Sequence, residues 1–276
     1  MGILYLVATP IGNLEDITAR ALRILREARL IAAEDTRRTQ QLLNYFGIHT
    51  PLLSYHQHNE RARLQAVLSA LAEGDVALVS DAGTPALNDP GQLLVRAAID
   101  AGFTVCPIPG ASAPITALIA SGLPTDAFLY LGYLPRKSKD RRALLQSVAN
   151  LPYTLIFLET PHRLVDALAD LEAILGNREG AVARELTKRH EEIARGLVGI
   201  LRTQFESAPP KGEITLVIAG APEAAPIQWE QARLQTEIQT ALGRGESPSR
   251  LATRLAAQSG WARRQIYQMV LEENNV

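Results

Sequence analysis

The chain has 276 residues, of which 47% are hydrophobic and 21% charged, and its formal net charge at pH 7 is -1. This composition is typical of a soluble globular protein with room for two compact domains, and it excludes a disordered or collagen-like chain. A single cysteine excludes an internal disulfide and a thiolate metal cluster. Because the chain has no global positive field, any binding of nucleic acid must use local clusters of basic residues.

The first residues, GILYLVATPIGN, carry no basic region ahead of their short apolar stretch. They therefore do not resemble a signal peptide. No apolar run in the sequence approaches the length needed to span a bilayer. We expect a cytoplasmic protein.

In the first part of the chain, short apolar runs alternate with amphipathic segments of helical length. The apolar runs predict strands over 3–8, 30–33, 76–79 and 103–108. Helical spacing of apolar residues predicts helices over 17–28, 59–73 and 92–101. The alternation is typical of a sheet covered by helices on both faces.

The same alternation restarts after SGLP (121–124), with strands predicted over 128–131, 154–158, 181–185 and 214–219. We therefore predict an α/β fold with two α/β lobes and a ligand cleft between them, plus a small C-terminal all-α appendage. The predicted boundaries are a first domain over 1–121, a second over 122–220, a linker over 221–226 (APEAAP) and a helical domain over 227–276. Ser247 and Pro248 mark a helix start inside that last domain.

Several common site motifs are absent. There is no G-x-x-x-x-G-K-[ST] and no G-x-G-x-x-G after the first strand, which excludes a P-loop and a standard dinucleotide fingerprint. The string that begins at His190 has Ala194 where a zinc protease needs its second histidine. His56 and His58 lack a third ligand nearby, so no metal site is predicted.

A candidate ligand loop follows each of the first four predicted strands, over 9–13, 34–38, 80–91 and 109–113, and small residues are frequent in the first, third and fourth of these loops. Ligands of doubly wound sheets bind at the carboxyl ends of the strands. Small residues there let backbone groups approach a ligand closely. One such loop is compatible with a tight turn, whereas four at one sheet edge favour a ligand site.

Seven strings occur in this order along the chain: TPIGNLEDIT, AEDTR, SDAGTPALNDPG, PIPGASA, FLETPHR, RELTKRHEE and KGEITLVI. Over residues 3–219 the sequence thereby resembles one branch of the tetrapyrrole methylase superfamily, the bacterial ribosomal RNA small subunit methyltransferase I group. The C-terminal helical region is also similar to the one in that group.

The resemblance implies an S-adenosylmethionine site in the cleft between two α/β domains, and a homodimer. It implies methyl transfer to the ribose 2′-hydroxyl of a decoding-centre cytidine in 16S rRNA, with the small ribosomal subunit as the expected partner. Relatives that methylate porphyrin or corrin rings carry a G-P-G-D type of first loop. This chain has TPIGN at 9–13 instead, which argues against a tetrapyrrole acceptor.

The resemblance also assigns cofactor-binding residues. Pro10 belongs to the first cofactor loop, and Leu158 and Leu186 are expected to line the adenosine pocket, although core packing explains both leucines equally well. The central cofactor loop and the loop expected to contact the methionine part contribute the remaining candidates: Asp81, Ala82, Gly83, Ser112 and Ala113.

A ribose hydroxyl is a poor nucleophile unless a base removes its proton. The candidates for that base are Asp35, His56 and Glu185. Arg37 is a candidate for a bidentate phosphate contact. A structural ion pair of Asp35 with Arg37 or with Arg38 is an equal alternative.

Two clusters of basic residues are candidates for RNA contacts, with ordinary helix surfaces as the alternative. They comprise Arg136, Lys137, Lys139, Arg141 and Arg142 in the second domain and Arg250, Arg254, Arg263 and Arg264 in the C-terminal region.

Two other functions remain open from the sequence. A methyltransferase acting on a small molecule or a protein side chain keeps the cofactor and changes the acceptor. A non-catalytic RNA-binding module accounts for the basic clusters but not for four ligand loops at one sheet edge.

Overall fold

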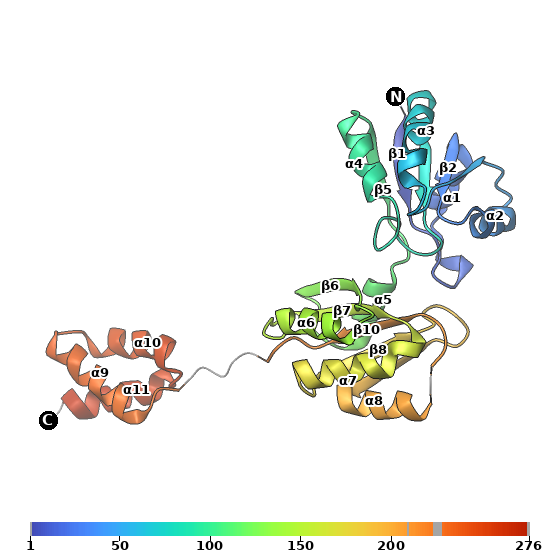
Figure 1. The fold of residues 1–276 in the computed structure, drawn as a ribbon. Helices are drawn as coiled ribbons and strands as arrows, with labels where there is room; N and C mark the ends of the chain where they lie inside the picture. The colour runs from blue at the N-terminus through green and yellow to red at the C-terminus, as the bar shows by residue number, and fades with distance from the viewer. Residues whose placement is uncertain (1, 209, 223–227, 275–276) are drawn as a thin grey trace. The chain divides into compact units, whose positions relative to one another are not determined.

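The computed structural model describes residues 2–208, 210–222 and 228–274. The chain divides into two compact units, Met1–Gly220 and Ala221–Val276 (Figure 1). Most of the predicted linker over 221–226 lies outside the described residues. Each unit is described by itself below.

The first part of the larger unit, here called the first lobe, is a parallel five-stranded sheet with helices on both faces, coloured blue to blue-green in Figure 1. Its elements are β1 (Ile3–Val7), η1 (Leu14–Asp16), α1 (Ala19–Glu27), β2 (Leu30–Ala33), α2 (Thr36–Tyr45), β3 (Leu52–Ser54), α3 (Glu60–Glu73), β4 (Val76–Val79), α4 (Gln92–Asp100) and β5 (Thr104–Ile108).

The strand order β3-β2-β4-β1-β5 brings the predicted ligand loops to one edge of the sheet. Ala33 pairs with Val79, and Val7 pairs with Ile108, so these strands end at the same level. The inner strands read as continuous apolar runs because helices cover both faces, and every residue of β4 is buried. Helices α1 and α2 pack on one face of the sheet, and α3 and α4 pack on the other.

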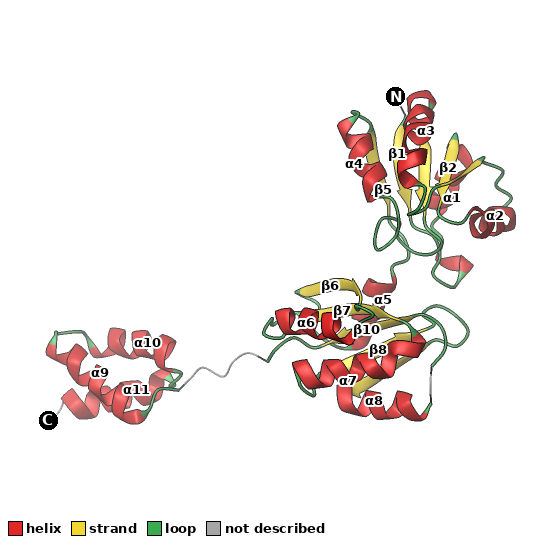
Figure 2. Ribbon diagram, viewed as in Figure 1, coloured by secondary structure: helices red, strands yellow, loops and turns green. Residues whose placement is uncertain are grey.

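The remaining part of the larger unit, here called the second lobe, contains a mixed sheet (Figure 2). Its strand order is β6-β7-β10-β8-β9, and only β6 and β7 run parallel. Its elements are α5 (Ala113–Ser121), β6 (Phe128–Tyr133), α6 (Ser138–Val148), β7 (Thr154–Glu159), η2 (Pro161–Arg163), α7 (Leu164–Leu175), β8 (Glu179–Arg184), β9 (Glu192–Leu197), α8 (Val198–Ser207) and β10 (Ile214–Ile218).

Helices α6, α7 and α8 cover one face of the second sheet, and α5 covers the other. The apolar cluster on the α5 face includes Ile11 and Leu186 together with Ala117 and Leu118 of α5, and Ala82 of the first lobe packs against it. The two lobes therefore share a hydrophobic core.

The structure confirms the predicted α/β class and adds two strands that the sequence pattern missed. Both β3 and β9 are edge strands. Strand β3 has three residues, and β9 carries charged residues at Glu192 and Arg195. The structure also moves the boundary between the lobes. Helix α5, predicted as the end of the domain over 1–121, contacts β10, β8 and β7 and so packs with the second sheet.

The smaller unit consists of α9 (Gln231–Gly243), α10 (Pro248–Ser259) and α11 (Arg263–Asn274). Its core joins Leu234 and Ile238 of α9 to residues of the other two helices. Gly260 takes φ 69° and ends α10, as the sequence pattern predicts. In the part of the chain that the structure describes, no helix is long and apolar enough to cross a membrane.

Candidate functional site

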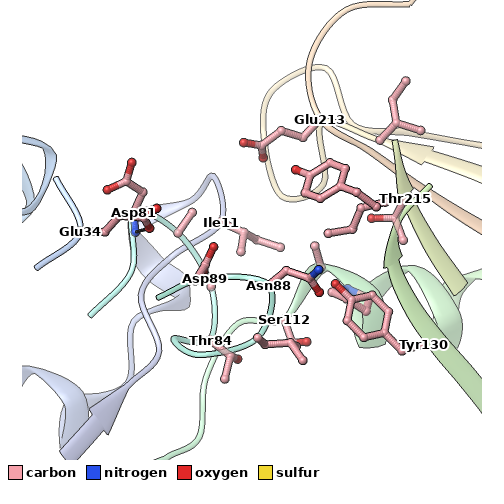
Figure 3. Close-up of a pocket in the computed structure, with 18 of the residues that line it drawn as sticks. Ile11, Glu34, Asp81, Thr84, Asn88, Asp89, Ser112, Tyr130, Glu213 and Thr215 are labelled. Atoms are coloured by element: carbon pink, nitrogen blue, oxygen red, sulfur yellow. Dashed lines mark hydrogen bonds between the residues drawn. The ribbon is translucent and has the colours of Figure 1, made fainter. Parts of the chain in front are cut away.

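A cleft of about 260 Å³, partly open to solvent, lies at the carboxyl edge of the first sheet, and the second lobe forms its other wall. Figure 3 shows Glu34, Asp81 and Asp89 on the side of the first lobe and Tyr130, Glu213 and Thr215 on the side of the second. The loops that follow β1, β2, β4 and β5 all contribute to it.

Six of the eight predicted cofactor residues line this cleft, namely Asp81, Ala82, Gly83, Ser112, Ala113 and Leu158. Pro10 is not among its lining residues. Leu186 is 7% exposed and packs in the core shared by the lobes, which favours the packing role that the sequence left open.

The cleft also includes lining residues that the sequence analysis did not select. From the first lobe these are Ile11, Glu34, Arg38, Thr84, Leu87, Asn88 and Asp89, and from the second lobe Pro114, Tyr130, Tyr133, Glu213, Ile214 and Thr215. The first set lies in or beside the loops that were predicted to bind a ligand. The second set carries no sequence signal, because only folding brings those strands to the cleft.

The backbone of the central loop is fixed against the first loop. Gly83 N–H donates to the Thr9 carbonyl, and Thr9 N–H donates to the Gly83 carbonyl, both at 2.9 Å. Gly83 has φ +78°, a conformation that side chains disfavour. This bridge presents the 82–84 backbone to the cleft.

The loop after β4 also reaches the second lobe. A side chain at Gly132, where φ is +65°, would overlap the amide of Asn88 at 2.3 Å. Gly132 lies where the pairing of β6 with β7 shifts register. Because Gly132 has no side chain, the amide of Asn88 can pack against the backbone of β6 at this bulge.

The cleft is acidic. Of the described residues that line it, four are carboxylates and one is an arginine: Glu34, Asp81, Asp89, Glu213 and Arg38. Burial raises the pKa of Glu34, and burial together with the Glu34 charge raises the pKa of Asp89 to about 6. An acidic pocket repels phosphate groups and favours a cationic ligand.

The residues present fit S-adenosylmethionine, which carries a sulfonium and an ammonium group beside an apolar adenine. Carboxylates of the first lobe match the positive charges, while Ile11, Leu158 and Ile214 offer apolar contacts. Gly83 and Ala113 leave space for the ligand against the backbone.

The carboxylate of Asp35 contacts residues at the start of its own helix. Its carboxylate caps α2 by accepting from Arg37 N–H at 2.8 Å, and it forms an ion pair with the Arg37 guanidinium at 2.7 Å. These bonds hold the pKa of Asp35 well below its usual range. A carboxylate of such low pKa is a poor base at neutral pH. The structural pair is thus the alternative that the geometry favours.

His56 and Glu185 do not line the cleft. His56 Nδ1 accepts from the His58 backbone N–H at 3.2 Å. Glu185 pairs with Lys188 at 2.9 Å, and that contact lowers its pKa. None of the three predicted bases is therefore among the described residues that line the cleft.

The predicted RNA contacts divide by exposure. Arg141 is 4% exposed and its guanidinium lies 2.6 Å from the Asp170 carboxylate, so its prediction as an RNA contact is wrong. A buried, paired guanidinium cannot reach a phosphate. Arg254 is paired with Glu246 at 2.7 Å. The exposed members are Arg37, Arg136, Lys137, Lys139, Arg142, Arg250, Arg263 and Arg264.

Residues 3–201 match the family model described as Tetrapyrrole (Corrin/Porphyrin) Methylases. Solved structures share the fold. One is the methyltransferase CobJ, with TM-score 0.60 and 18% identity over 80% of this chain and 95% of that one. Another is uroporphyrin-III-C-methyltransferase from Thermus thermophilus, with TM-score 0.55 and 22% identity over 79% of this chain and 94% of that one. These matches define the class as a tetrapyrrole methylase fold.

Relatives of full length narrow the class. The chain is 50% identical to the ribosomal RNA small subunit methyltransferase I of Synechocystis sp., over 99% of this chain and 98% of that one. It is 47% identical to the protein of the same name from Halalkalibacterium halodurans, over 99% and 96% of the two chains. The chain belongs to the tetrapyrrole methylase family and, within it, to the ribosomal RNA small subunit methyltransferase I group.

Proposed function

We propose that the chain transfers a methyl group from S-adenosylmethionine to the ribose 2′-hydroxyl of a decoding-centre cytidine in 16S rRNA. The observation that carries the proposal is the acidic cleft with apolar walls in a chain of this family. Such a cleft suits a cationic methyl donor and does not suit a phosphate-bearing cofactor.

The roles of the cleft residues follow from their chemistry. The backbone at Gly83 and Ser112 and the carboxylate of Asp81 would hold the donor, and Leu158 would contact its adenine. When bound, the donor supplies a methyl group that is already activated as a sulfonium. The protein's main task is then to align the acceptor oxygen with that methyl, and alignment contributes about 7–11 kcal/mol to many reactions.

The acceptor is expected to bind through exposed basic residues at and beside the rim of the acidic cleft. Arg37 has 88% of its side chain exposed, while Arg38 lies on the cleft wall with 66% exposed. Both stand at the start of α2, beside the carboxyl edge of the first sheet. Arg37 pairs with Asp35 and Arg38 with Asp81, but both guanidinium groups are largely exposed and could exchange these partners for RNA phosphates while a ribose reaches the cleft.

An alkaline ladder of 16S rRNA tests the methylated atom. A 2′-O-methyl group removes the nucleophile of alkaline cleavage, so we expect one gap in the ladder after small subunits react with the purified chain and S-adenosylmethionine. Subunits from a strain lacking the chain provide the unmethylated control. Complete incorporation of labelled methyl with an unbroken ladder would contradict the ribose assignment. Incorporation into protein or small molecules, resistant to RNase, would instead support the alternative acceptor.

Truncation after Pro222 tests the C-terminal helices. The larger unit is compact by itself, so we expect the truncated chain to keep its affinity for S-adenosylmethionine in calorimetry. It should bind small subunits more weakly, with a salt dependence that is shallower by about 0.7–0.9 for each phosphate that the chain no longer neutralises. Exposed Arg264 is expected to contribute more to this binding than Arg254, which Glu246 already pairs. If truncation leaves subunit binding and its salt dependence unchanged, the helical unit has another role.

We further propose that the protein is a cytoplasmic homodimer. In support, Ile115 and Ile119 lie one helical turn apart on α5, with 43% and 71% of their surface exposed. Exposed apolar side chains on one helix face are typical of a protein interface. Sedimentation of the full chain as a monomer at micromolar concentration would contradict the dimer.

A further inference from the structure

A second cavity adjoins the cleft, and the two have a common wall. It has a volume of about 630 Å³, is partly open to solvent, and is lined by the start of α3 and by one side of α4, with Gln57, Gln92 and Arg96 among its residues. Glu34, Asn88 and Asp89 line both cavities. A group on this wall faces the donor site on one side and a second ligand-sized space on the other.

The three carboxylates near this wall differ in their partners. Asp81 accepts from the Asp35 backbone N–H at 3.0 Å and pairs with Arg38 at 3.2 Å. The carboxylate of Glu34 accepts from the Asp81 backbone N–H at 3.3 Å. Within the described part of the chain, no cationic side chain lies within ion-pair distance of Asp89. Of these three carboxylates, Asp89 is the one that has neither an ion-pair partner nor a backbone N–H donor among the described residues, and the Ser80 hydroxyl is the group that hydrogen-bonds to it.

We propose that Asp89 is the base for the methyl transfer and that the acceptor ribose enters through the second cavity; this rests on the proposed function. In that step the ribose 2′-oxygen gains the methyl carbon and loses its proton to the Asp89 carboxylate. The carbon–sulfur bond of the donor breaks, and its electron pair stays on sulfur. Asp89 then returns the proton to solvent.

The environment of Asp89 supports this role. Its pKa of about 6 leaves it ionised at neutral pH yet more basic than an ordinary carboxylate. Burial is the main cause of that shift, and the charge of Glu34 is the next. Other titratable or polar groups that interact with Asp89 are Ser80, Asp81, Glu213, Tyr130 and Tyr133. The charged residues Arg38, Glu60 and Arg96 each line one of the two cavities.

The test compares the full-length wild type with Asp89→Asn in single-turnover methylation of small subunits. We expect the wild-type rate to rise with pH and to level off above about 6, where Asp89 is ionised. We expect the rate of Asp89→Asn to show no such rise with pH. The variant should also react about 10²–10⁴-fold more slowly than the wild type, which is the usual contribution of a positioned base. Asp89→Glu should recover part of the rate. Asp166→Asn, on the exposed surface of α7, is the matched control.

A second measurement does not depend on activity. Because folding raises the pKa of Asp89 from its ordinary value of 3.8 to about 6, ionising it costs stability increasingly as the pH rises between these values, and the cost is complete above about 6. Asp89→Asn should therefore raise the midpoint of thermal unfolding at pH 8, and by less at pH 5. Its affinity for S-adenosylmethionine should stay within about threefold of wild type, well under the tenfold that corresponds to about 1.4 kcal/mol.

Three outcomes would overturn the inference. If Asp89→Asn methylates small subunits at the wild-type rate and the product still shows the ladder gap, Asp89 is not the base. A loss of donor affinity that accounts for the whole rate loss would make Asp89 a donor ligand instead. Lower stability of Asp89→Asn at pH 8 would show that the carboxylate is structural. A wild-type product without a ladder gap is a separate failure, because it contradicts the ribose acceptor itself.

Discussion

Replacing Gly83 by valine is expected to abolish useful binding of S-adenosylmethionine. Gly83 has φ +78°, and a Cβ there would lie 3.3 Å from Ile11 Cγ2, inside the cleft. A β-branched side chain both strains this backbone and fills the space that a ligand needs against it. We expect a loss of affinity of about 10²-fold, or roughly 2.7 kcal/mol, measured by calorimetry.

Gly102→Val is the matched control for this substitution. Gly102 has φ +80°, and no described atom lies within 4 Å of the position of its Cβ. Both variants should therefore lose stability by a similar amount, about 1–3 kcal/mol, while only Gly83→Val loses the ligand. Equal ligand affinity in the two variants would remove Gly83 from the site.

Replacing Arg141 by alanine is expected to destabilise the larger unit by about 3–5 kcal/mol, because it leaves the buried Asp170 carboxylate without its partner. Two guanidinium nitrogens of Arg141, Nε and Nη2, lie 2.8 and 2.6 Å from Asp170 Oδ2. Ser138 Oγ donates to the same oxygen at 2.9 Å. Urea unfolding measures the loss. The affinity for S-adenosylmethionine should stay unchanged under conditions where the variant is folded.

Arg142→Ala removes the same charge as Arg141→Ala but from an exposed position, so it separates the effect of losing a charge from the effect of losing a buried ion pair. Arg142 is half exposed and lies 3.7 Å from Asp170, so its removal should cost less than about 1 kcal/mol. Its effect should appear instead in weaker binding of small subunits at low salt. A larger loss of stability from Arg142→Ala than from Arg141→Ala would contradict the roles assigned to the pair.

The sequence could predict the ligand loops of the first lobe because parallel strands end together at one sheet edge. Apolar runs identify the strands, and the loops follow at their carboxyl ends without further information. Asp89 lies in one of these loops, but nothing in the string NDPG distinguishes it from Asp81. Its lack of an ion-pair partner depends on residues far away in the sequence, such as Arg38, which the fold gives to Asp81 instead.

The role of Arg141 could not be predicted for a similar reason. The segment RKSKDRR over 136–142 is a basic surface run by composition. Only the packing of α6 on α7 shows that Arg141 faces inward, where Asp170 of α7 meets it. The edge strand β9 was missed because its charged residues interrupt the apolar pattern that identifies inner strands.

The hydrophobic core shared by the two lobes has a consequence for how the enzyme unfolds. Ile11 of the first lobe is buried in a cluster with Ala181 and Val217 of the second sheet, so separating the lobes exposes apolar surface on both. Melting of either lobe then removes support from the other, which favours one cooperative transition for residues 1–220. A donor bound in the cleft would raise the melting temperature of both lobes together, since it binds only where both are folded.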